Sequence, residues 1–234
     1  MDNKTLIYES ANSRLFLLED GESASRLVLK EQKRTNKSIH KLVHIYELLK
    51  QVEVPGIAQT ISYDYTGATP HVVFKFVEGE SLHNLLSKGA LSLEQFFNIA
   101  ISICGSLSVL HQLGILHKDI NPNNIIWDAA TAQATLIDFD GATSIKQAQR
   151  QLNDPGKLEG TLAYISPEQT GRINREVDFR SDLYSLGATF YELLSGVTPF
   201  DFEDPAAMIY AQIAKTPLPL HAHKAQLPIA LVKL

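Results

Sequence analysis

Cysteine is almost missing from this sequence, because Cys104 is the only one among 234 residues. A chain with one cysteine cannot form an internal disulfide, and so little cysteine is typical of a reducing compartment. The N-terminus has no secretory pattern, and no apolar run approaches the roughly 20 residues that span a bilayer. We therefore expect a cytoplasmic protein that has no membrane partner.

An excess of basic charge is also missing. The sequence has 26 acidic and 21 basic residues, which gives a net charge of −5. This balance predicts no basic face for nucleic acid, so nucleic acid is not expected as a partner. Apolar residues make up 44% and charged residues 20%, as in an ordinary soluble globular chain. The length is sufficient for the core of one large domain or of two lobes.

The residue pattern changes near residue 80. Before it, apolar runs at residues 15–18, 26–30, 60–65 and 71–77 predict two strand pairs, and residues 38–51 have the spacing of an amphipathic helix. After it, a capping box of Ser92 and Gln95 opens a long helix that Gly114 ends. Two more helices are predicted over residues 181–194 and from Asp204 onward. The pattern predicts an α+β chain with a small β-rich lobe (1–78), a helical lobe (79–234) and a hinge at residues 76–81.

Three polar residues just past this junction carry the strongest chemical signal. Asp119 lies on a predicted loop between a helix and a short strand, Asn124 follows five residues later, and Asp138 comes at the end of an apolar run. A carboxylate at Asp119 could accept the proton of a substrate hydroxyl. Carboxamide and carboxylate oxygens at Asn124 and Asp138 suit magnesium. Each alone is more often a turn or cap residue, but the joint spacing favours phosphoryl transfer.

Three further residues have competing interpretations. Lys30 ends an apolar strand, where it could meet nucleotide phosphates or simply face solvent. Its place about 90 residues before Asp119, in the other lobe, favours the phosphates. Asp182 lies near a helix start, where a buried carboxylate could hold backbone N–H groups of the loop that carries Asp119. Cys104 lies in an apolar helical pattern, which predicts a core residue rather than a nucleophile.

Together these residues resemble the eukaryotic-like protein kinase family over essentially the whole chain. His117-Lys118-Asp119 is similar to the family's catalytic loop, Asp138-Phe139 to its magnesium motif, and Ser166-Pro167-Glu168 to the end of its activation segment. The resemblance implies a bilobal fold, ATP and Mg²⁺ as cofactors, Asp119 as catalytic base, and Asn124 and Asp138 as metal ligands. It also implies Lys30 at the phosphates and Ile126 beneath the purine.

The finer wording of these motifs resembles the kinase domain at the front of large bacterial sensor proteins. That likeness implies protein substrates and covalently linked or associated sensor and output domains. In complete kinases, further helices follow the position that matches Leu234. They also supply an arginine that pairs with the glutamate at the position of Glu168. We therefore expect a fragment or a shortened product whose helical lobe exposes apolar surface.

The sequence departs from the family at the nucleotide end. No glycine precedes Gly21, so the glycine-rich loop is missing, and residues 10–13, which include Ser10 and Asn12, take its place. Ile45 stands where a helix glutamate usually pairs with the strand lysine, and Glu47 is two residues away, about 200° around the helix. Asn121 replaces a lysine, and Asp140 replaces a glycine.

One regulatory expectation follows from the activation segment. Lys118 replaces the arginine typical of kinases that loop phosphorylation switches on, and no Ser, Thr or Tyr lies between Ile145 and Gly160. Thr161 is expected to contact the catalytic loop. We predict that phosphorylation of Thr143 or Ser144 is not the switch.

Three functions are compatible with the sequence. The leading hypothesis is an ATP- and Mg²⁺-dependent protein serine/threonine kinase in bacterial-type signalling. The alternative is a pseudokinase, a nucleotide-binding regulatory module of a larger sensor, which the nucleotide-end departures favour. The third is a small-molecule phosphotransferase, which the Ser166-Pro167-Glu168 region argues against.

Overall fold

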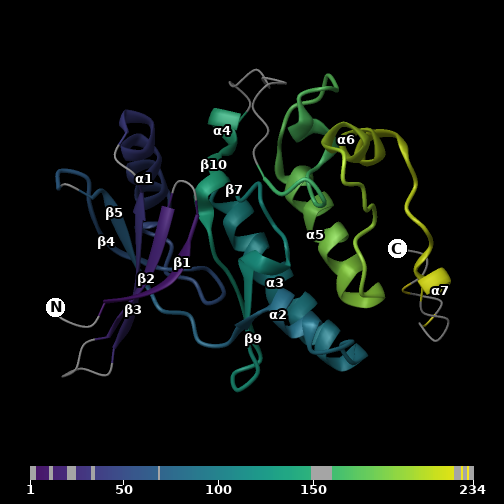
Figure 1. The fold of residues 1–234 in the computed structure, drawn as a ribbon, viewed down its shortest axis with the longest axis horizontal. Helices are drawn as coiled ribbons and strands as arrows, with labels where there is room; N and C mark the ends of the chain where they lie inside the picture. The colour runs from purple at the N-terminus through teal and green to yellow at the C-terminus, as the bar shows by residue number, and fades with distance from the viewer. Residues whose placement is uncertain are drawn as a thin grey trace. The chain divides into compact units, whose positions relative to one another are not determined.

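The structure, a computed structural model, describes residues 4–10, 13–19, 25–32, 35–67, 69–148, 160–223, 228 and 231. The chain divides into two compact units, Met1–Glu78 and Gly79–Leu234. The first unit is mostly strand and the second mostly helix (Figure 1). This agrees with the α+β composition that the sequence predicts.

The first unit is a five-stranded antiparallel sheet with one helix. Its elements are β1 (Lys4–Glu9), β2 (Ser13–Glu19), β3 (Arg26–Gln32), α1 (Asn36–Leu49), β4 (Thr60–Asp64) and β5 (His71–Lys75). The strand order is β1-β2-β3-β5-β4. Both predicted strand pairs are confirmed, since β2 pairs with β3 and β4 with β5. The edge strand β1 has no predicted counterpart, and all six of its residues are exposed.

Helix α1 confirms the predicted amphipathic pattern. Leu42, Ile45 and Leu49 fall at helical spacing, and each is at most 2% exposed. Helix α1 packs against β4 and β5. Because Ile45 belongs to this buried stripe, the core of the first unit occupies the place where the family has its glutamate. Glu47 is exposed and pairs with Lys50 at 2.5 Å.

The second unit is built around two long helices, α3 (Leu93–Gln112) and α5 (Phe179–Ser195). Its other helices are α2 (Leu82–Ser87), α4 (Ile145–Ala148), α6 (Pro205–Ala214) and α7 (Leu220–His223), with 3-10 turns η1 (Pro122–Asn124), η2 (Phe139–Gly141) and η3 (Pro167–Thr170). Two small sheets complete it, from β6 (Glu80–Ser81), β8 (Ile125–Asp128) and β9 (Gln133–Leu136), and from β7 (Ile115–Leu116) and β10 (Thr143–Ser144).

The helix ends follow their capping residues. The Ser92 side chain accepts from the Gln95 N–H, and the Gln95 side chain accepts from the Ser92 N–H, which confirms the capping box of α3. Asp178 caps α5, whose C-terminal Gly196 has a φ of 83°. Asp204 caps α6, with Pro205 at its first position.

Helix α3 changes one expectation about membranes. Within the described ranges, α3 is long and apolar enough to cross a bilayer, as judged by length and composition. Polar residues interrupt the apolar ones, so the sequence has no continuous apolar run of this length. The mean hydropathy of the helix is nevertheless high enough for a membrane-spanning segment. A core helix also passes, and α3 packs against β9 and α5. The Ser102 hydroxyl accepts from the Ala134 N–H at 2.9 Å. These contacts bury one side of α3, while residues such as Ile101 and Cys104 on its other side stay exposed.

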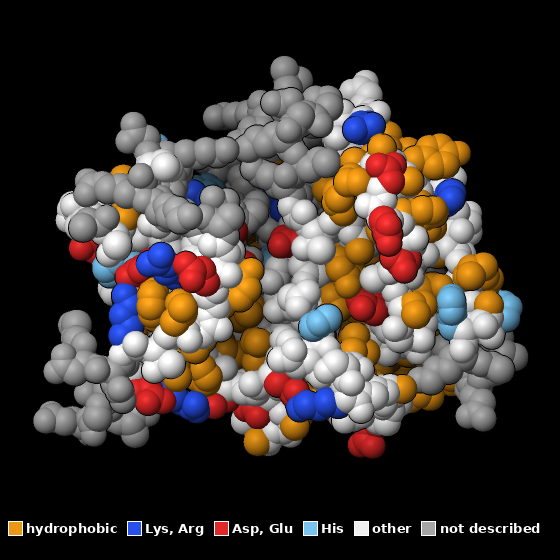
Figure 2. Space-filling view, in the orientation of Figure 1, with side chains coloured by type: hydrophobic (Ala, Val, Ile, Leu, Met, Phe, Trp, Pro, Cys, Tyr) orange, Lys and Arg blue, Asp and Glu red, His pale blue; other side chains and the backbone are white. Residues whose placement is uncertain are grey.

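Apolar side chains are exposed on the second unit, and some, such as Ile61, are exposed on the first unit too. Ile101 on α3 is 71% exposed and Tyr210 on α6 is 61% exposed. Hydrophobic side chains are visible over α6, and histidines gather at α7 (Figure 2). His221 and His223 are exposed. Among the described residues, no group of three or more His, Cys, Asp or Glu side chains could hold a metal ion.

Candidate active site

Asp182 on α5 holds the loop that follows β7. Its side chain is fully buried, and its Oδ2 accepts from the His117 N–H at 2.9 Å. Its Oδ1 accepts from the Lys118 N–H at 2.8 Å, and His111 Nε2 lies 2.9 Å from Oδ2. These bonds confirm the prediction that Asp182 braces this loop. The carboxylate holds two successive backbone N–H groups, so the start of the loop has a fixed conformation.

Lys118 has a left-handed backbone with a φ of 66°. A lysine pays about 1 kcal/mol or more for this conformation, which persists only where the surroundings enforce it. Asp182 holds its N–H, and Gln169 Nε2 donates to its carbonyl at 2.8 Å. The residue before Asp119 is therefore constrained on both sides.

The Asp119 carboxylate is surrounded by hydrogen-bond donors. Its Oδ1 accepts from the Thr161 N–H and hydroxyl, both at 2.9 Å, and from Asn121 Nδ2 at 3.1 Å. Its Oδ2 accepts from Asn124 Nδ2 at 3.0 Å. The expected contact of Thr161 with this loop is confirmed. Because Oδ1 already takes three donors and Oδ2 takes one, Oδ2 has the greater capacity to accept another.

Asn121 and Asn124 both orient Asp119. Asn124 Nδ2 donates to the Asp119 carbonyl at 2.9 Å as well as to its carboxylate, and the side chain is buried. Nothing in the described part of the chain donates to Asn124 Oδ1. Asn121 caps η1, and its Nδ2 also donates to the Asp119 carbonyl at 3.1 Å. The residue that replaces the family's lysine is thus a neutral donor to the carboxylate.

Asp138 follows β9 and is tied to this loop through its neighbours. The Ile137 N–H donates to the Asn124 carbonyl at 2.9 Å, and His117 Nε2 donates to the Ile137 carbonyl at 3.0 Å. The His117 ring packs on Phe139 with centroids 4.6 Å apart. Asp138 has a φ of 58°, and its exposed carboxylate accepts from the Asp140 N–H at 3.3 Å.

The nucleotide-end residues lie in the first unit. Lys30 is 6% exposed on β3, opposite Leu15 of β2 and Val72 of β5. Ser10 follows β1, and its Oγ lies 2.9 Å from the Ser13 Oγ and accepts from the Ser13 N–H at 3.0 Å. Asn12 lies outside the described residues. Two serine hydroxyls, those of Ser10 and Ser13, thus lie beside the position of the missing glycine loop.

Ile126 and the predicted hinge flank the start of the second unit. Ile126 is partly exposed on β8, opposite Ser81 of β6. Gly79 has a φ of 111°, and a Cβ there would lie 2.2 Å from the Trp127 carbonyl oxygen. Only glycine fits this approach. Trp127 itself is buried.

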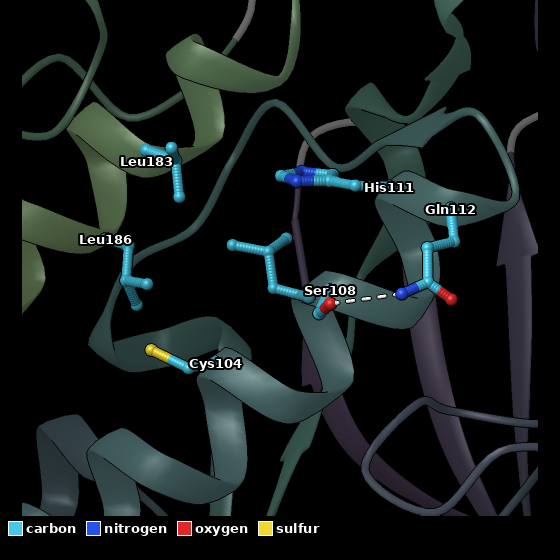
Figure 3. A pocket seen from close by; sticks show the side chains of 7 residues that line it. Cys104, Ser108, His111, Gln112, Leu183 and Leu186 are labelled. Carbon is cyan, nitrogen blue, oxygen red and sulfur yellow. Dashed lines mark hydrogen bonds between the residues drawn. The ribbon is translucent and has the colours of Figure 1, made fainter.

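A pocket of about 420 Å³ lies between α3 and α5, away from the predicted site residues (Figure 3). Leu107, Leu183 and Leu186 line it together with Ser108, Gln112, His111 and Cys104. The prediction that Cys104 is a core residue is wrong, since its side chain is exposed at this pocket. The apolar pattern of α3 is wider than its buried stripe. Partial burial still raises the pKa of the Cys104 thiol, which disfavours the thiolate.

The end of the activation segment packs on α5 and α6. Glu168 Oε1 accepts from the Ser181 hydroxyl at 2.6 Å, so a neighbour on α5 contacts the glutamate for which no arginine was expected. Thr143 is buried in β10, and residues 149–159 lie outside the described residues. The buried Gln169 was not predicted as a site residue, and only its tertiary contact with Lys118 reveals it.

Comparison with known proteins agrees with this arrangement. A family model described as "Protein kinase domain" matches residues 15–228. The chain is 35% identical over 176 residues to serine/threonine-protein kinase pkn2 of Myxococcus xanthus, which covers 74% of this chain and 21% of that protein. It is 32% identical over 154 residues to PknB of Mycobacterium tuberculosis, covering 65% and 24% of the two chains.

A third relative is serine/threonine-protein kinase PksC of Streptomyces coelicolor, 30% identical over 204 residues, covering 85% of this chain and 35% of that protein. The chain thus spans between about a fifth and about a third of the length of these relatives. The family model matches well over half of the chain, and its match includes the loop, the 3-10 turns and both long helices. The chain therefore belongs to the protein kinase family.

Proposed function

We propose that this chain transfers the terminal phosphoryl group of ATP to serine or threonine hydroxyls of proteins in bacterial-type signalling. The relatives that bear serine/threonine-protein kinase names support this class of substrate. One observation carries the proposal: the Asp119 carboxylate is oriented by four donors, of which only one reaches Oδ2. Oδ2 can then accept the proton of the attacking hydroxyl.

Asn124 and Asp138 are proposed to hold Mg²⁺. The Asn124 side-chain nitrogen donates to Asp119, so the side-chain oxygen Oδ1 can face a cation, for which it is a hard ligand. The Asp138 carboxylate is exposed and directly follows Ile137, which is bonded to the Asn124 carbonyl. Two such oxygen ligands fit Mg²⁺, which usually completes its shell with substrate phosphates and water. When bound, the ion would neutralise charge on the phosphates.

The first unit is proposed to bind the rest of the nucleotide. Lys30 supplies a cation for the phosphates, and the turn at Ser10, with Asn12, supplies hydroxyl and amide groups in place of glycine backbone. In the second unit, Ile126 offers a partly exposed apolar surface for the purine. On this assignment residues 1–78 are the N-lobe and residues 79–234 belong to the C-lobe of one kinase domain.

The partners are proposed by analogy with the relatives. These are three to five times longer than the part that matches this chain. We propose protein substrates, linked or associated sensor and output domains, and a cytoplasmic location. No nucleic-acid or membrane partner is proposed.

Transfer of labelled phosphate from ATP to a generic protein substrate tests the function. We expect Asp119→Asn to lower the transfer rate by about a hundredfold or more, the usual scale for losing a general base. Asp128→Asn is the matched control, because Asp128 is a turn residue of the same unit that caps Ala130 and Thr131. Equal rates for the two variants would contradict the role of Asp119.

A binding measurement beside the transfer assay separates the alternatives. If ATP and Mg²⁺ raise the Tm of the wild-type protein but no phosphate is transferred, the result would favour a nucleotide-binding regulator. Transfer to sugars or aminoglycosides but not to proteins would favour a small-molecule phosphotransferase.

A further inference from the structure

The peptide bond between Lys118 and Asp119 is held by groups from three parts of the second unit. Its carbonyl accepts from Gln169 Nε2 at 2.8 Å, and its N–H donates to His117 Nδ1 at 3.4 Å. The preceding N–H is held by Asp182. Asp119 is therefore oriented through its backbone as well as through its carboxylate. Gln169 is the one member of this set that belongs to the end of the activation segment.

Gln169 is fully committed in this position. It is buried in η3, where its Oε1 accepts from the Ser166 hydroxyl at 2.8 Å while its Nε2 reaches the Lys118 carbonyl. The Ser166 N–H, which donates to the same oxygen at 3.3 Å, fixes which end of the amide faces the loop, because an N–H can only donate and therefore requires the oxygen. The nitrogen must then point at the carbonyl, so the contact is a directed donor bond.

Gly160 leaves room for this bond. Its φ is 103°, and a Cβ there would lie 3.0 Å from the Lys118 carbonyl oxygen and 3.8 Å from Gln169 Nε2. Any side chain at residue 160 would press on the acceptor. The segment from 160 to 169 thus approaches the catalytic loop twice, through Thr161 at the Asp119 side chain and through Gln169 at the backbone before it.

We propose that Gln169 is a positioning residue for the phosphoryl-transfer reaction, which acts by holding the left-handed Lys118 and thereby the carboxylate of Asp119. The inference rests on the proposed kinase function for its kinetic consequence. Gln169 does not touch the reacting atoms; its effect passes through the Lys118–Asp119 peptide. Because the bond is between neutral groups, it links the end of the activation segment to the base without a phosphate.

Gln212 on α6 provides a matched comparison. It is also buried, its Nε2 donates to the Leu162 and Ala163 carbonyls at 2.9 Å, and its Oε1 accepts from the Tyr184 hydroxyl at 2.6 Å. The two glutamines therefore make the same kinds of bond, because each donates to a backbone carbonyl and accepts from a side-chain hydroxyl. Only Gln169 reaches the catalytic loop, so replacing Gln212 reproduces the loss of a buried amide without loss of the link.

The kinetic test uses Gln169→Met and Gln212→Met in the full chain with ATP, Mg²⁺ and a protein substrate. Methionine keeps the volume and removes both polar atoms. We expect Gln169→Met to lower kcat by about ten- to a hundredfold with little change in KM for ATP, the scale of a misplaced catalytic group. Gln212→Met should keep kcat within about threefold while losing similar thermal stability. Equal kcat losses in both variants would overturn the proposal.

A second measurement does not depend on activity. Amide hydrogen exchange of a peptide covering residues 115–121 should be faster in Gln169→Met than in wild type or Gln212→Met. In the background of Lys118→Asn, which tolerates a left-handed backbone better, the effect of Gln169→Met should shrink. Unchanged exchange at residues 115–121 would overturn the positioning role of Gln169, even if the enzyme were active. Faster exchange in a protein that transfers no phosphate would instead refute the proposed kinase function, while the hold of Gln169 on the Lys118–Asp119 peptide would be supported.

Discussion

The two units position their polar residues by different means. In the second unit, the buried side chains of Asp182, Asn121 and Gln169 all form hydrogen bonds to the backbone of Lys118 or Asp119. In the first unit, the corresponding functional position is filled by Ile45, and stability comes from a sheet and an apolar helix stripe. The difference teaches that apolar packing fills the place of a polar residue in the first unit, whereas hydrogen bonds set the geometry of the loop that carries Asp119 in the second.

The largest effect is expected from Asp182→Ala, which removes the centre of the polar system. Two loop N–H groups and His111 lose their acceptor inside the core. We expect a loss of about 3 to 5 kcal/mol in the free energy of unfolding, measured by chemical denaturation. Asp178→Ala, which removes the partly buried cap of the same helix, should cost about 1 kcal/mol. Similar losses for both would contradict the central role of Asp182.

Ile45→Glu tests the other side of the comparison by restoring the family's residue. Ile45 is 2% exposed in an apolar stripe, so a carboxyl group there is buried. We expect a loss of about 3 kcal/mol, or about 6–12 °C in Tm, and no gain in phosphoryl transfer. A variant with wild-type Tm and a higher transfer rate would show that the first unit still accommodates the ion pair.

Tyr184→Phe is a smaller perturbation that can be followed by pH. Burial, followed by the charge of Glu168, raises the pKa of Tyr184 from 10 to about 12. The folded state therefore holds the phenol proton more tightly than the unfolded chain. This contribution to stability is complete below pH 10 and is lost as the pH rises toward 12. Phenylalanine should cost about 1 kcal/mol at neutral pH and flatten the alkaline decline between pH 10 and 12.

Tyr210→Phe is the control for that titration, since Tyr210 is 61% exposed on the same α5–α6 side of the second unit. Its alkaline unfolding profile should match wild type. A Tyr184→Phe profile that also matched wild type would contradict the raised pKa.

The smallest effect is expected from Cys104→Ser. The side chain is exposed at the pocket between α3 and α5, so the free energy of unfolding should change by less than about 0.5 kcal/mol. Its neighbour Ile103 is fully buried, and Ile103→Ser should cost several times more. Denaturation midpoints of the two variants give the answer. A large loss for Cys104→Ser would restore the core assignment that the structure replaces.

The parts of the fold that local chemistry dictates could be predicted from the sequence. The capping box of Ser92 and Gln95, the Asp204-Pro205 start of α6 and the β2–β3 pair need only neighbours in the chain. The two-residue strands β6, β7 and β10 exist because distant segments pair, so no local pattern signals them.

The candidate site divides in the same way. The spacing of Asp119 and Asn124 sufficed to predict that they belong to one site, and their side chains are hydrogen-bonded to each other. Asp182 could be expected as a brace because a carboxylate near a helix start has few other uses when buried. Gln169 could not be found, because a glutamine is a common helix residue and its partner is 51 positions away. Cys104 was misassigned because the apolar surface of α3 extends beyond its buried side.

Gly79 has a consequence for protein engineering. The chain leaves its first unit at this residue, with its α-carbon pressed against the Trp127 carbonyl. A chimera that joins the helical unit to a foreign nucleotide-binding module must keep glycine at the junction. A spectroscopic label attached there would displace β8, so reporters of interdomain motion belong on either side of this residue.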